Sequence, residues 1–252
     1  MERKADLNRE LGVLFPVCDG DERHFDRFLA ELTRLGFPFA VHFDHCSAET
    51  KRRFKEHPLF LEGHEDDDPN SFFGEDSRQS ALDILVKHGF AWMLSFDVDE
   101  TLEKNAPEKI RKLLDADAGG YDVIEFPLLD LWGDARHYRV DGPFQQSHRE
   151  KMFRLGIGRW RYTHATIHAP MCTPLHKEHE VRVIQPDIFV MHWGIMNMED
   201  VRFHTERWNR VYEKKIGKNP YGFYPYMNDP VGNPPDIREF DPDDIGPDFA
   251  RR

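Results

Sequence analysis

The chain has 252 residues, which is enough for one large α/β domain or two small ones. Hydrophobic residues make up 39% of it, with 20 Phe and 5 Trp, so most of the chain can contribute to a core. Its formal charge of −12 argues against a nucleic-acid backbone or an anionic membrane as the main partner. We therefore expect any anionic ligand to be held locally, by a metal ion or a few cations.

The N-terminal stretch and the cysteines predict a soluble protein of a reducing compartment. The first ten residues, MERKADLNRE, are charged, and no apolar run approaches the ~20 residues of a membrane helix. The three cysteines, Cys18, Cys46 and Cys172, are odd in number and lack the paired spacing of a zinc site. We expect reduced thiols in a cytoplasmic protein without a transmembrane segment.

The N-terminal part is predicted to begin β-α-β. An apolar run over residues 11–18 predicts a buried strand that ends before Asp19. Residues 21–35 carry apolar side chains at helical spacing and are followed by Gly36, which is typical of the end of a helix. A second strand over residues 37–44 ends in an aspartate, Asp44. This order favours a parallel sheet with a right-handed crossover.

The next part leads to a pair of aspartates. Residues 62–76 are acidic and without a period, which predicts a surface loop. Residues 77–88 predict a helix, and residues 90–96 predict a strand that is apolar on both faces and therefore central in the sheet. Asp97 and Asp99 follow at the carboxyl end of that strand.

The C-terminal half shows weaker patterns. We predict a helix over 105–116, a strand over 121–132, short strands between 136 and 175, an extended stretch over 181–193 interrupted at Pro186, and a helix over 198–215. Residues 218–252 are crowded with Pro, Gly and Asp and predict an extended or partly disordered tail.

Asp97 and Asp99 have the spacing of a metal-binding pair. In an extended chain, residues i and i+2 project from the same side, with Cα atoms about 6.5–7 Å apart. In open α/β sheets, ligands bind outside the carboxyl ends of the strands. A hard divalent cation accepts carboxylate and phosphate oxygens together, so such a pair can hold a metal-bound diphosphate without a basic patch. Similar doublets in "DDDPN" and "DPDD" follow no apolar strand.

The stretch "SFDVDETL" is similar to the D-x-D motif, often "lDaDE.l", of glycosyltransferases with the GT-A fold, particularly family 2. "LGVLFPVCDGDE" occupies the place of that family's first strand and turn. "AVHFDHCSAET" is similar to its second strand, and "SRQSALDILVKHGFAWMLSFD" to the helix and strand before the motif. The resemblance extends in order over about residues 11–215.

The resemblance implies an α/β fold. It implies a single Rossmann-like GT-A domain over residues 1–217, with a mostly parallel central sheet and helices on both faces. Its nucleotide-binding half is expected at about 11–103 and its acceptor half at about 104–217. Residues 218–252 form the tail.

The resemblance also implies a site and an activity. The protein is expected to move a sugar from a nucleotide diphosphate sugar to an unknown glycan, lipid, protein or small-molecule acceptor. The D-x-D is expected to hold Mn²⁺ or Mg²⁺, which neutralises the diphosphate leaving group. The implied metal ligands are Asp97, Asp99 and His192, and the implied donor-binding residues are Asp19, Asp44, Arg78 and Asp97.

The catalytic base is where the sequence departs from the family. Ala169 stands where inverting members have a glutamate. His168 can accept a proton near neutral pH, and Glu178 or Glu180 can be brought in by the loop. We take His168 and Glu178 as the candidate catalytic residues. If neither acts as a base, the enzyme is retaining or is not an active transferase.

Other interpretations of the same residues remain open. "FDVDETL" also resembles the first motif of haloacid-dehalogenase-type phosphatases, in which Asp97 is the nucleophile and Asp99 the general acid/base. In that family the motif ends the first strand, whereas here about ninety residues precede it. A non-catalytic nucleotide- or carbohydrate-binding relative is a further alternative. A zinc enzyme is disfavoured, because "HKEH" lacks the "HExxH" arrangement.

Overall fold

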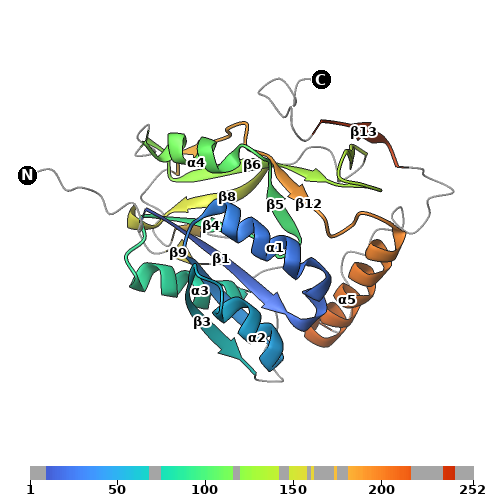
Figure 1. Cartoon of the computed structure of the whole chain (residues 1–252), viewed down its shortest axis with the longest axis horizontal. Coiled ribbons are helices and arrows are strands. Elements are labelled where there is room, and N and C mark those ends of the chain that lie inside the picture. The colour runs from blue at the N-terminus through green and yellow to red at the C-terminus, as the bar shows by residue number, and fades with distance from the viewer. Residues whose placement is uncertain are drawn as a thin grey trace, which may run out of the picture. The chain divides into compact units, whose positions relative to one another are not determined.

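The structure is a computed structural model of the whole chain, shown in Figure 1. It describes residues 10–67, 75–115, 120–141, 148–157, 160–161, 173–174, 181–216 and 235–241. The chain divides into two compact units. Unit 1 comprises Met1–Asp99, Pro107–Phe126 and Arg149–Pro186, and unit 2 comprises Glu100–Ala106, Pro127–His148 and Asp187–Arg252.

Unit 1 is built around four parallel strands. These are β1 (Leu11–Cys18), β2 (Phe39–Asp44), β3 (Phe60–Asp66) and β4 (Trp92–Ser95). They lie in the order β3-β2-β1-β4, and each neighbouring pair is parallel. The chain therefore adds β2 and β3 on one side of β1 and then places β4 on the other side.

Further strands extend unit 1 beyond β4. β8 (His148–Arg154) pairs with β4 in antiparallel fashion and is followed in the sheet by β6 (Val123–Asp130), of which Val123–Phe126 belong to unit 1. β11 (Val183–Ile184) pairs with β6 in parallel, and β9 (Trp160–Arg161) pairs with β10 (Thr173–Pro174).

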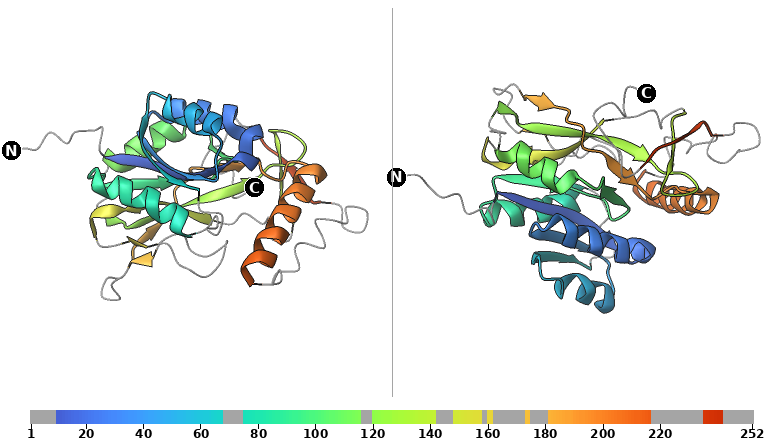
Figure 2. Two further views of the ribbon diagram at one scale, coloured as in Figure 1. Left: turned by 90° about the horizontal axis from the view of Figure 1, so that it is seen from below. Right: turned by 45° about the horizontal axis from the view of Figure 1, so that its top comes forward.

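Helices cover both faces of the parallel strands. The helices of unit 1 are α1 (Glu22–Leu35), α2 (Ala48–Lys55), α3 (Glu75–Lys87) and α4 (Ala106–Asp115), the last of which begins in unit 2. Figure 2, left, shows α1 and α2 on one side of β1 and α3 on the other. The predicted fold class, α/β with a mostly parallel sheet and helices on both faces, is confirmed in this unit.

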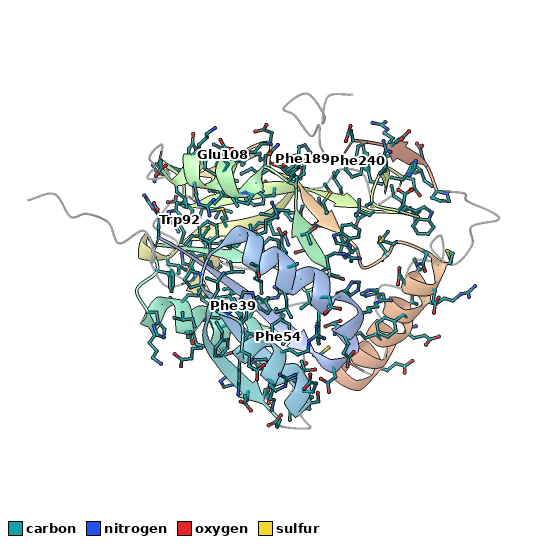
Figure 3. All side chains as sticks on the ribbon, in the orientation of Figure 1. Phe39, Phe54, Trp92, Glu108, Phe189 and Phe240 are labelled. Atoms are coloured by element: carbon teal, nitrogen blue, oxygen red, sulfur yellow. The ribbon has the colours of Figure 1, made fainter. Side chains whose placement is uncertain are left out.

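Aromatic rings fill the space between the strands and the helices α1 and α2. The ring of Phe15 on β1 lies 4.6 Å from that of Phe28, 5.4 Å from that of Phe39 and 5.6 Å from that of Phe54. All four side chains are fully buried. Phe39 and Phe54 are labelled in Figure 3. One strand residue thus joins β1 to β2, α1 and α2 through ring contacts.

The opposite face of the strands packs against α3. Its core contains Leu14, Ala40, Ala81, Leu82, Ile84, Leu85, Phe90, Met93, Val123, Phe153, Leu155 and Trp160. Gly12 on β1 allows α3 to approach closely, because a Cβ atom there would lie 2.6 Å from Cδ2 of Leu85. Nearly all residues of β1 and β2 are buried, so both faces of these strands are covered, as expected for parallel strands with helices on both sides.

Two elements of unit 1 differ from the sequence prediction. Residues 60–66 form the strand β3, although the acidic stretch 62–76 was predicted to be a loop. α2 was not predicted at all, because only two of its eight residues, Thr50 and Phe54, are buried. Both elements lie toward the edge of the sheet. A strand at the edge is partly exposed to solvent, so only some of its residues need to be apolar. The predicted domain boundary at residue 217 stays a prediction.

Unit 2 contains β5 (Glu100–Leu102), β7 (His137–Arg139), β12 (Val190–His192), β13 (Ile237–Glu239) and α5 (Met198–Ile216). β12 pairs with β5 and with the Leu128–Asp130 part of β6. β13, in the region predicted to be a tail, pairs with β7. Its neighbour Phe240 is buried against Tyr138, Phe189 and other apolar residues, and Phe189 and Phe240 are labelled in Figure 3.

His42 on β2 gives unit 1 a pH-dependent stability. The ring is buried against α3, where Nδ1 lies 2.7 Å from Ser80 Oγ, and it stacks on His64 at 5.3 Å. Burial, and to a smaller extent the neighbouring His64, lowers the pKa of His42 to about 4.

We expect the free energy of unfolding to fall as the pH falls from about 6.5 to about 4. Over this window the unfolded chain binds a proton at His42 and the folded chain does not, so the stability present above pH 6.5 is lost on acidification. The loss from this residue is on the order of 3 kcal/mol. Urea unfolding at several pH values checks it: His42→Leu should show a smaller pH dependence than the wild type. An unchanged slope would contradict the assignment.

Candidate functional site

The topology of unit 1 places a switch point between β1 and β4. β2 and β3 extend from one side of β1, and β4 lies on the other side. In open α/β sheets, ligands bind outside the carboxyl ends of the strands where the order reverses. The residues that follow β1 and β4, namely Asp19 and the segment 96–99, are therefore the first candidates for a site in this unit.

Asp97 and Asp99 follow β4, as predicted, but not in extended form. β4 ends at Ser95, and residues 98 and 99 form a turn. Val98 is buried, whereas Asp97 and Asp99 are half-buried. The argument from strand alternation therefore does not apply to this pair. Val98 nevertheless packs into the core, and both carboxylates stay partly accessible.

Arg78 on α3 contacts the first aspartate. Its Nη2 donates to Oδ1 of Asp97, and its Nη1 donates to Ser95 Oγ at 3.2 Å and to the Phe96 carbonyl oxygen at 3.3 Å. The guanidinium group therefore fixes the end of β4 and orients the Asp97 carboxylate. Arg78 was predicted to bind the donor directly, and in the structure it contacts Asp97.

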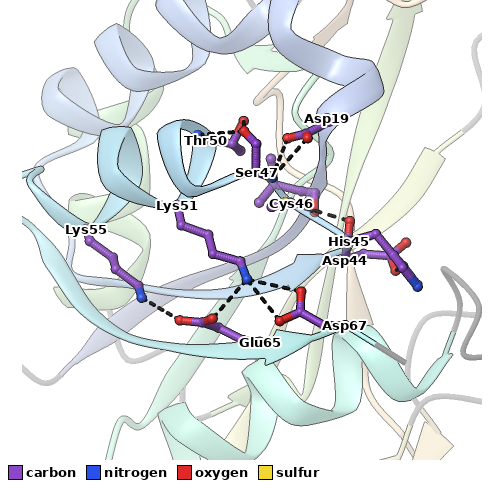
Figure 4. A network of polar contacts seen from close by, with 11 residues as sticks. Asp19, Asp44, His45, Cys46, Ser47, Thr50, Lys51, Lys55, Glu65 and Asp67 are labelled. Carbon is purple, nitrogen blue, oxygen red and sulfur yellow. Dashed lines mark hydrogen bonds and ion pairs between the residues drawn. The ribbon is translucent and has the colours of Figure 1, made fainter. Parts of the chain in front are cut away.

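Asp19 connects the end of β1 to the start of α2. It lies in a short 3-10 turn (η2, Asp19–Asp21), and its Oδ1 and Oδ2 accept from the backbone N–H of Ser47 at 3.0 and 2.9 Å. Ser47 is the N-cap of α2, and its Oγ accepts from the Thr50 amide. Figure 4 shows these contacts. Asp19 thus supports the loop at the carboxyl ends of β1 and β2.

Asp44 is the last residue of β2 and lies opposite Cys18 of β1 in the sheet register. It is buried, and its Oδ1 lies 2.6 Å from Nδ1 of His45. His45 has a left-handed backbone conformation, with φ of 51°, which turns the chain sharply after the strand. Asp44 therefore lies at the carboxyl ends of the parallel strands, as predicted, and so does Asp19.

Ion pairs neutralise the lysines of α2. Lys51 Nζ lies 2.9 Å from Glu65 and 3.1 Å from Asp67, and Lys55 Nζ lies 2.5 Å from Glu65, as Figure 4 shows. The hydrogen bonds from Lys55 and Lys51 lower the pKa of Glu65 to about 2. These two lysines are therefore engaged with β3 and with Asp67, and they do not form a basic patch for a diphosphate.

His192 lies at the end of β12 in unit 2. It is opposite Asp130 in the register with β6, and its Nδ1 lies 2.6 Å from Oδ1 of Asp130. The next residue, Trp193, donates from Nε1 to Thr101 Oγ1 at 2.9 Å. Asp130 thus holds the His192 ring in one orientation. The predicted metal ligands Asp97 and Asp99 belong to unit 1, so the set of three stays a prediction.

The donor set of unit 1 fits Mn²⁺ or Mg²⁺ in kind. Carboxylate oxygens are the ligands that hard divalent cations prefer. Among the described residues, no group of three or more His, Cys, Asp or Glu side chains is close enough to hold a metal ion alone. Two carboxylates leave coordination positions for phosphate oxygens and water, which is how Mg²⁺ is usually bound with nucleotides.

Other predicted residues lie outside the described part of the chain. These are the candidate bases His168 and Glu178, the alternative Glu180, and Ala169. Cys18 and Cys46 form no disulfide bond within the described part of the chain, and Cys172 is outside it. Burial raises the pKa of Cys46 to about 12, so that thiol is unreactive.

Several solved structures are similar to this chain. Two crystal structures of S. aureus TarS 1-349, one in complex with UDP-GlcNAc, match with 14% and 15% identity over 57% of this chain and 47% and 45% of theirs, each with a TM-score of 0.42. A proposed nucleotide-diphospho-sugar transferase from Desulfovibrio desulfuricans G20 matches with 17% identity over 57% of this chain and 63% of its own, with a TM-score of 0.36. The chain spans less than half the length of the TarS structures. No protein-family model and no curated protein matches it.

One buried residue near the aspartates was not singled out in the sequence. His24, in the first turn of α1, is buried, and the charge of Asp99 acts on it. Its neighbours at helical spacing, such as Phe28, are apolar and identify the buried face of α1. Extending that spacing back by one turn from Phe28 leads to His24.

No helix in the described part of the chain has both the length and the hydropathy that crossing a bilayer requires.

Proposed function

We propose that this protein is a glycosyltransferase that moves a sugar from a nucleotide diphosphate sugar to an acceptor, with Mn²⁺ or Mg²⁺ bound by Asp97 and Asp99. The observation that carries the proposal is the position of these aspartates. They follow the central strand β4 directly, beside β1, at the point where the strand order reverses. The resemblance of "SFDVDETL" to a D-x-D motif agrees with this position.

The charges around the aspartates favour a metal that arrives with a diphosphate. Asp97 and Asp99 carry two negative charges, and Arg78 supplies one positive charge next to Asp97. A bare divalent cation is therefore attracted by a net charge of only about −1 in this cluster. The negative phosphates of a nucleotide add ligands and charge, so we expect tight metal binding only in the presence of a nucleoside diphosphate.

When bound, the metal supplies electrostatic neutralisation of the diphosphate leaving group. The chain's own residues do the rest: Arg78 orients the Asp97 carboxylate, and Asp19 holds the loop after β1 against α2. We propose His192, oriented by Asp130, as the third ligand and His168 or Glu178 as the base. Asp44 is proposed to contact the nucleotide at the end of β2. A cytoplasmic location is proposed because Cys18 and Cys46 form no disulfide bond within the described residues.

The phosphatase alternative requires Asp97 to act as a nucleophile. Arg78 donates to Oδ1 of that carboxylate, and the motif follows the fourth strand of unit 1 rather than the first. Both observations argue for a ligand-holding carboxylate in preference to an attacking one.

A thermal-shift screen of nucleoside diphosphates tests the function. With a ligand at about 100 times its dissociation constant, the stabilisation is about 2.7 kcal/mol, which raises Tm by roughly 5–10 °C for a chain of this size. We expect this rise with Mn²⁺ and one nucleoside diphosphate together, and little with either alone. The phosphatase and the non-catalytic binding protein are expected to give different results.

Three results, from this screen and from activity assays, would contradict the proposal in different ways. Phosphate release from p-nitrophenyl phosphate, with beryllofluoride trapping at Asp97, would establish the phosphatase. A metal-dependent shift without sugar release from any nucleotide sugar would indicate a non-catalytic binding protein. No shift in Tm with any of the common nucleoside diphosphates at millimolar concentration would show that the proposed nucleotide site is wrong.

A further inference from the structure

The ring of His24 has a defined hydrogen-bonding state. Arg23 Nε lies 3.0 Å from His24 Nε2. An arginine nitrogen can only donate, so Nε2 of His24 is the acceptor in this contact. In the neutral imidazole one nitrogen accepts and the other carries the proton. The proton of His24 is therefore on Nδ1.

The Nδ1–H group of His24 is buried and has no acceptor among the residues that the structure describes. The side chain is 6% exposed, and Nδ1 has no hydrogen-bond partner within the described ranges of the chain. A buried donor without an acceptor is unfavourable and needs an explanation in a native protein, often a ligand, ion or water at that position. Burial is the largest influence on the pKa of His24 and lowers it.

The position of α1 brings His24 to the D-x-D segment. Phe28 lies one turn further along the same face of α1, since residues four apart on a helix are neighbours. The Phe28 ring is 6.3 Å from that of Phe96, which directly precedes Asp97. The charged groups that act on His24 are those of Asp99, Arg23, Asp21 and Arg27. Of these four, only Asp99 lies outside the turn before α1 and the helix itself.

We propose that His24 is a positioning residue for Asp99: when the metal and the diphosphate are bound, its Nδ1–H donates to the Asp99 carboxylate and holds it in the orientation that binds the metal. This inference rests on the proposed function of the D-x-D pair. Partners of this kind, which hydrogen-bond to a ligating carboxylate, typically change metal affinity by about 10- to 100-fold when removed.

Three substitutions of His24 separate this role from a structural one. His24→Leu removes both ring nitrogens and fills their place with an apolar side chain. Asn places an amide near the position of Nδ1, whereas Gln places its amide near Nε2. We expect His24→Leu and His24→Gln to weaken Mn²⁺ binding in the presence of UDP or GDP about tenfold or more, and His24→Asn to retain most of it. Electron paramagnetic resonance of Mn²⁺ measures this without turnover.

The stability of His24→Leu should not fall together with its Mn²⁺ affinity. Because His24→Leu removes an unpaired buried donor, we expect its urea unfolding midpoint to be equal to or above that of the wild type. A matched control is His57→Leu. His57 is also a histidine of unit 1, but its ring contacts Thr33 Oγ1 and the Leu59 amide, so this variant should lose stability and keep the Mn²⁺ affinity.

The results distinguish failure of this inference from failure of the proposed function. If the wild type binds Mn²⁺ with a nucleoside diphosphate and His24→Leu binds it equally well, His24 has no role at Asp99. Equal losses in the Leu, Gln and Asn variants would also overturn the role of Nδ1. If the wild type binds no Mn²⁺ with any nucleoside diphosphate, both the proposed function and this inference are wrong.

Discussion

Asp99→Asn is expected to abolish Mn²⁺-dependent binding of nucleoside diphosphate and, with it, sugar transfer. The substitution keeps the size of the side chain but replaces a charged oxygen ligand with a neutral amide, and it removes half of the negative charge contributed by the pair. The loss in metal-dependent affinity should exceed the roughly 10- to 100-fold that removal of an outer partner costs. Isothermal titration of the nucleotide with and without Mn²⁺ measures it.

Asp99 is a cleaner probe than Asp97. Asp97 is also the partner of Arg78, so its substitution would leave a mostly buried guanidinium group without its ion pair and would disturb the end of β4. A suitable control is Asp26→Asn on α1, which makes the same change in charge at a solvent-exposed carboxylate whose surface ion pair with Arg53 contributes little stability. If Asp99→Asn retains Mn²⁺-dependent binding of UDP or GDP, Asp99 is not a metal ligand.

The elements that could be predicted are those in which burial follows a regular period. β1, α1, β2, α3 and β4 bury complete faces or complete strands, so their apolar residues recur at spacings of two or of three to four. The end of α1 was also predictable, because Gly36 takes a left-handed conformation with φ of 73°. In these segments, local pattern and tertiary packing agree.

β3 escaped prediction because its stability comes from the neighbouring elements. Its sequence, FLEGHED, has three acidic residues among seven and contains a glycine, and all of its residues are at least partly exposed. Lys51 and Lys55 of α2 neutralise Glu65, and the backbone pairs with β2 from Phe60 to Asp66, with one irregularity at Leu61. Neither kind of contact can be recognised from the segment alone, so the acidic composition was interpreted as a loop.

In the candidate site, the positions of the residues could be predicted but their contacts could not. The sequence placed Asp19, Asp44 and Asp97 at the carboxyl ends of strands, and the structure has them there. It did not predict that Asp19 accepts from the Ser47 amide or that Arg78 donates to Asp97, because these partners are 28 and 19 residues away in the chain. Such contacts depend on how α2 and α3 return to the sheet edge.

The importance of the aromatic core for this sheet edge can be tested at Phe15. Phe15 is fully buried on β1 and its ring contacts those of Phe28, Phe39 and Phe54. We expect Phe15→Ala to lower the free energy of unfolding by about 3–5 kcal/mol, because it removes apolar contacts and leaves a cavity that the surrounding rings cannot fill. Urea unfolding followed by circular dichroism measures the change.

The expected size of this effect depends on rigid packing between β1 and the helices α1 and α2. If α1 and α2 could move inward to fill the cavity, the loss would approach only the transfer free energy of the missing ring, at the low end of this range or below it. Val86→Ala on α3 is the control, since Val86 is 55% exposed and its truncation should change stability by less than about 0.5 kcal/mol. Similar values for the two variants would contradict the aromatic core as the support of β1. A large loss at Phe15 alone would show that the strand leading to Asp19 is held in place by the rings that also fix α1, and with it His24.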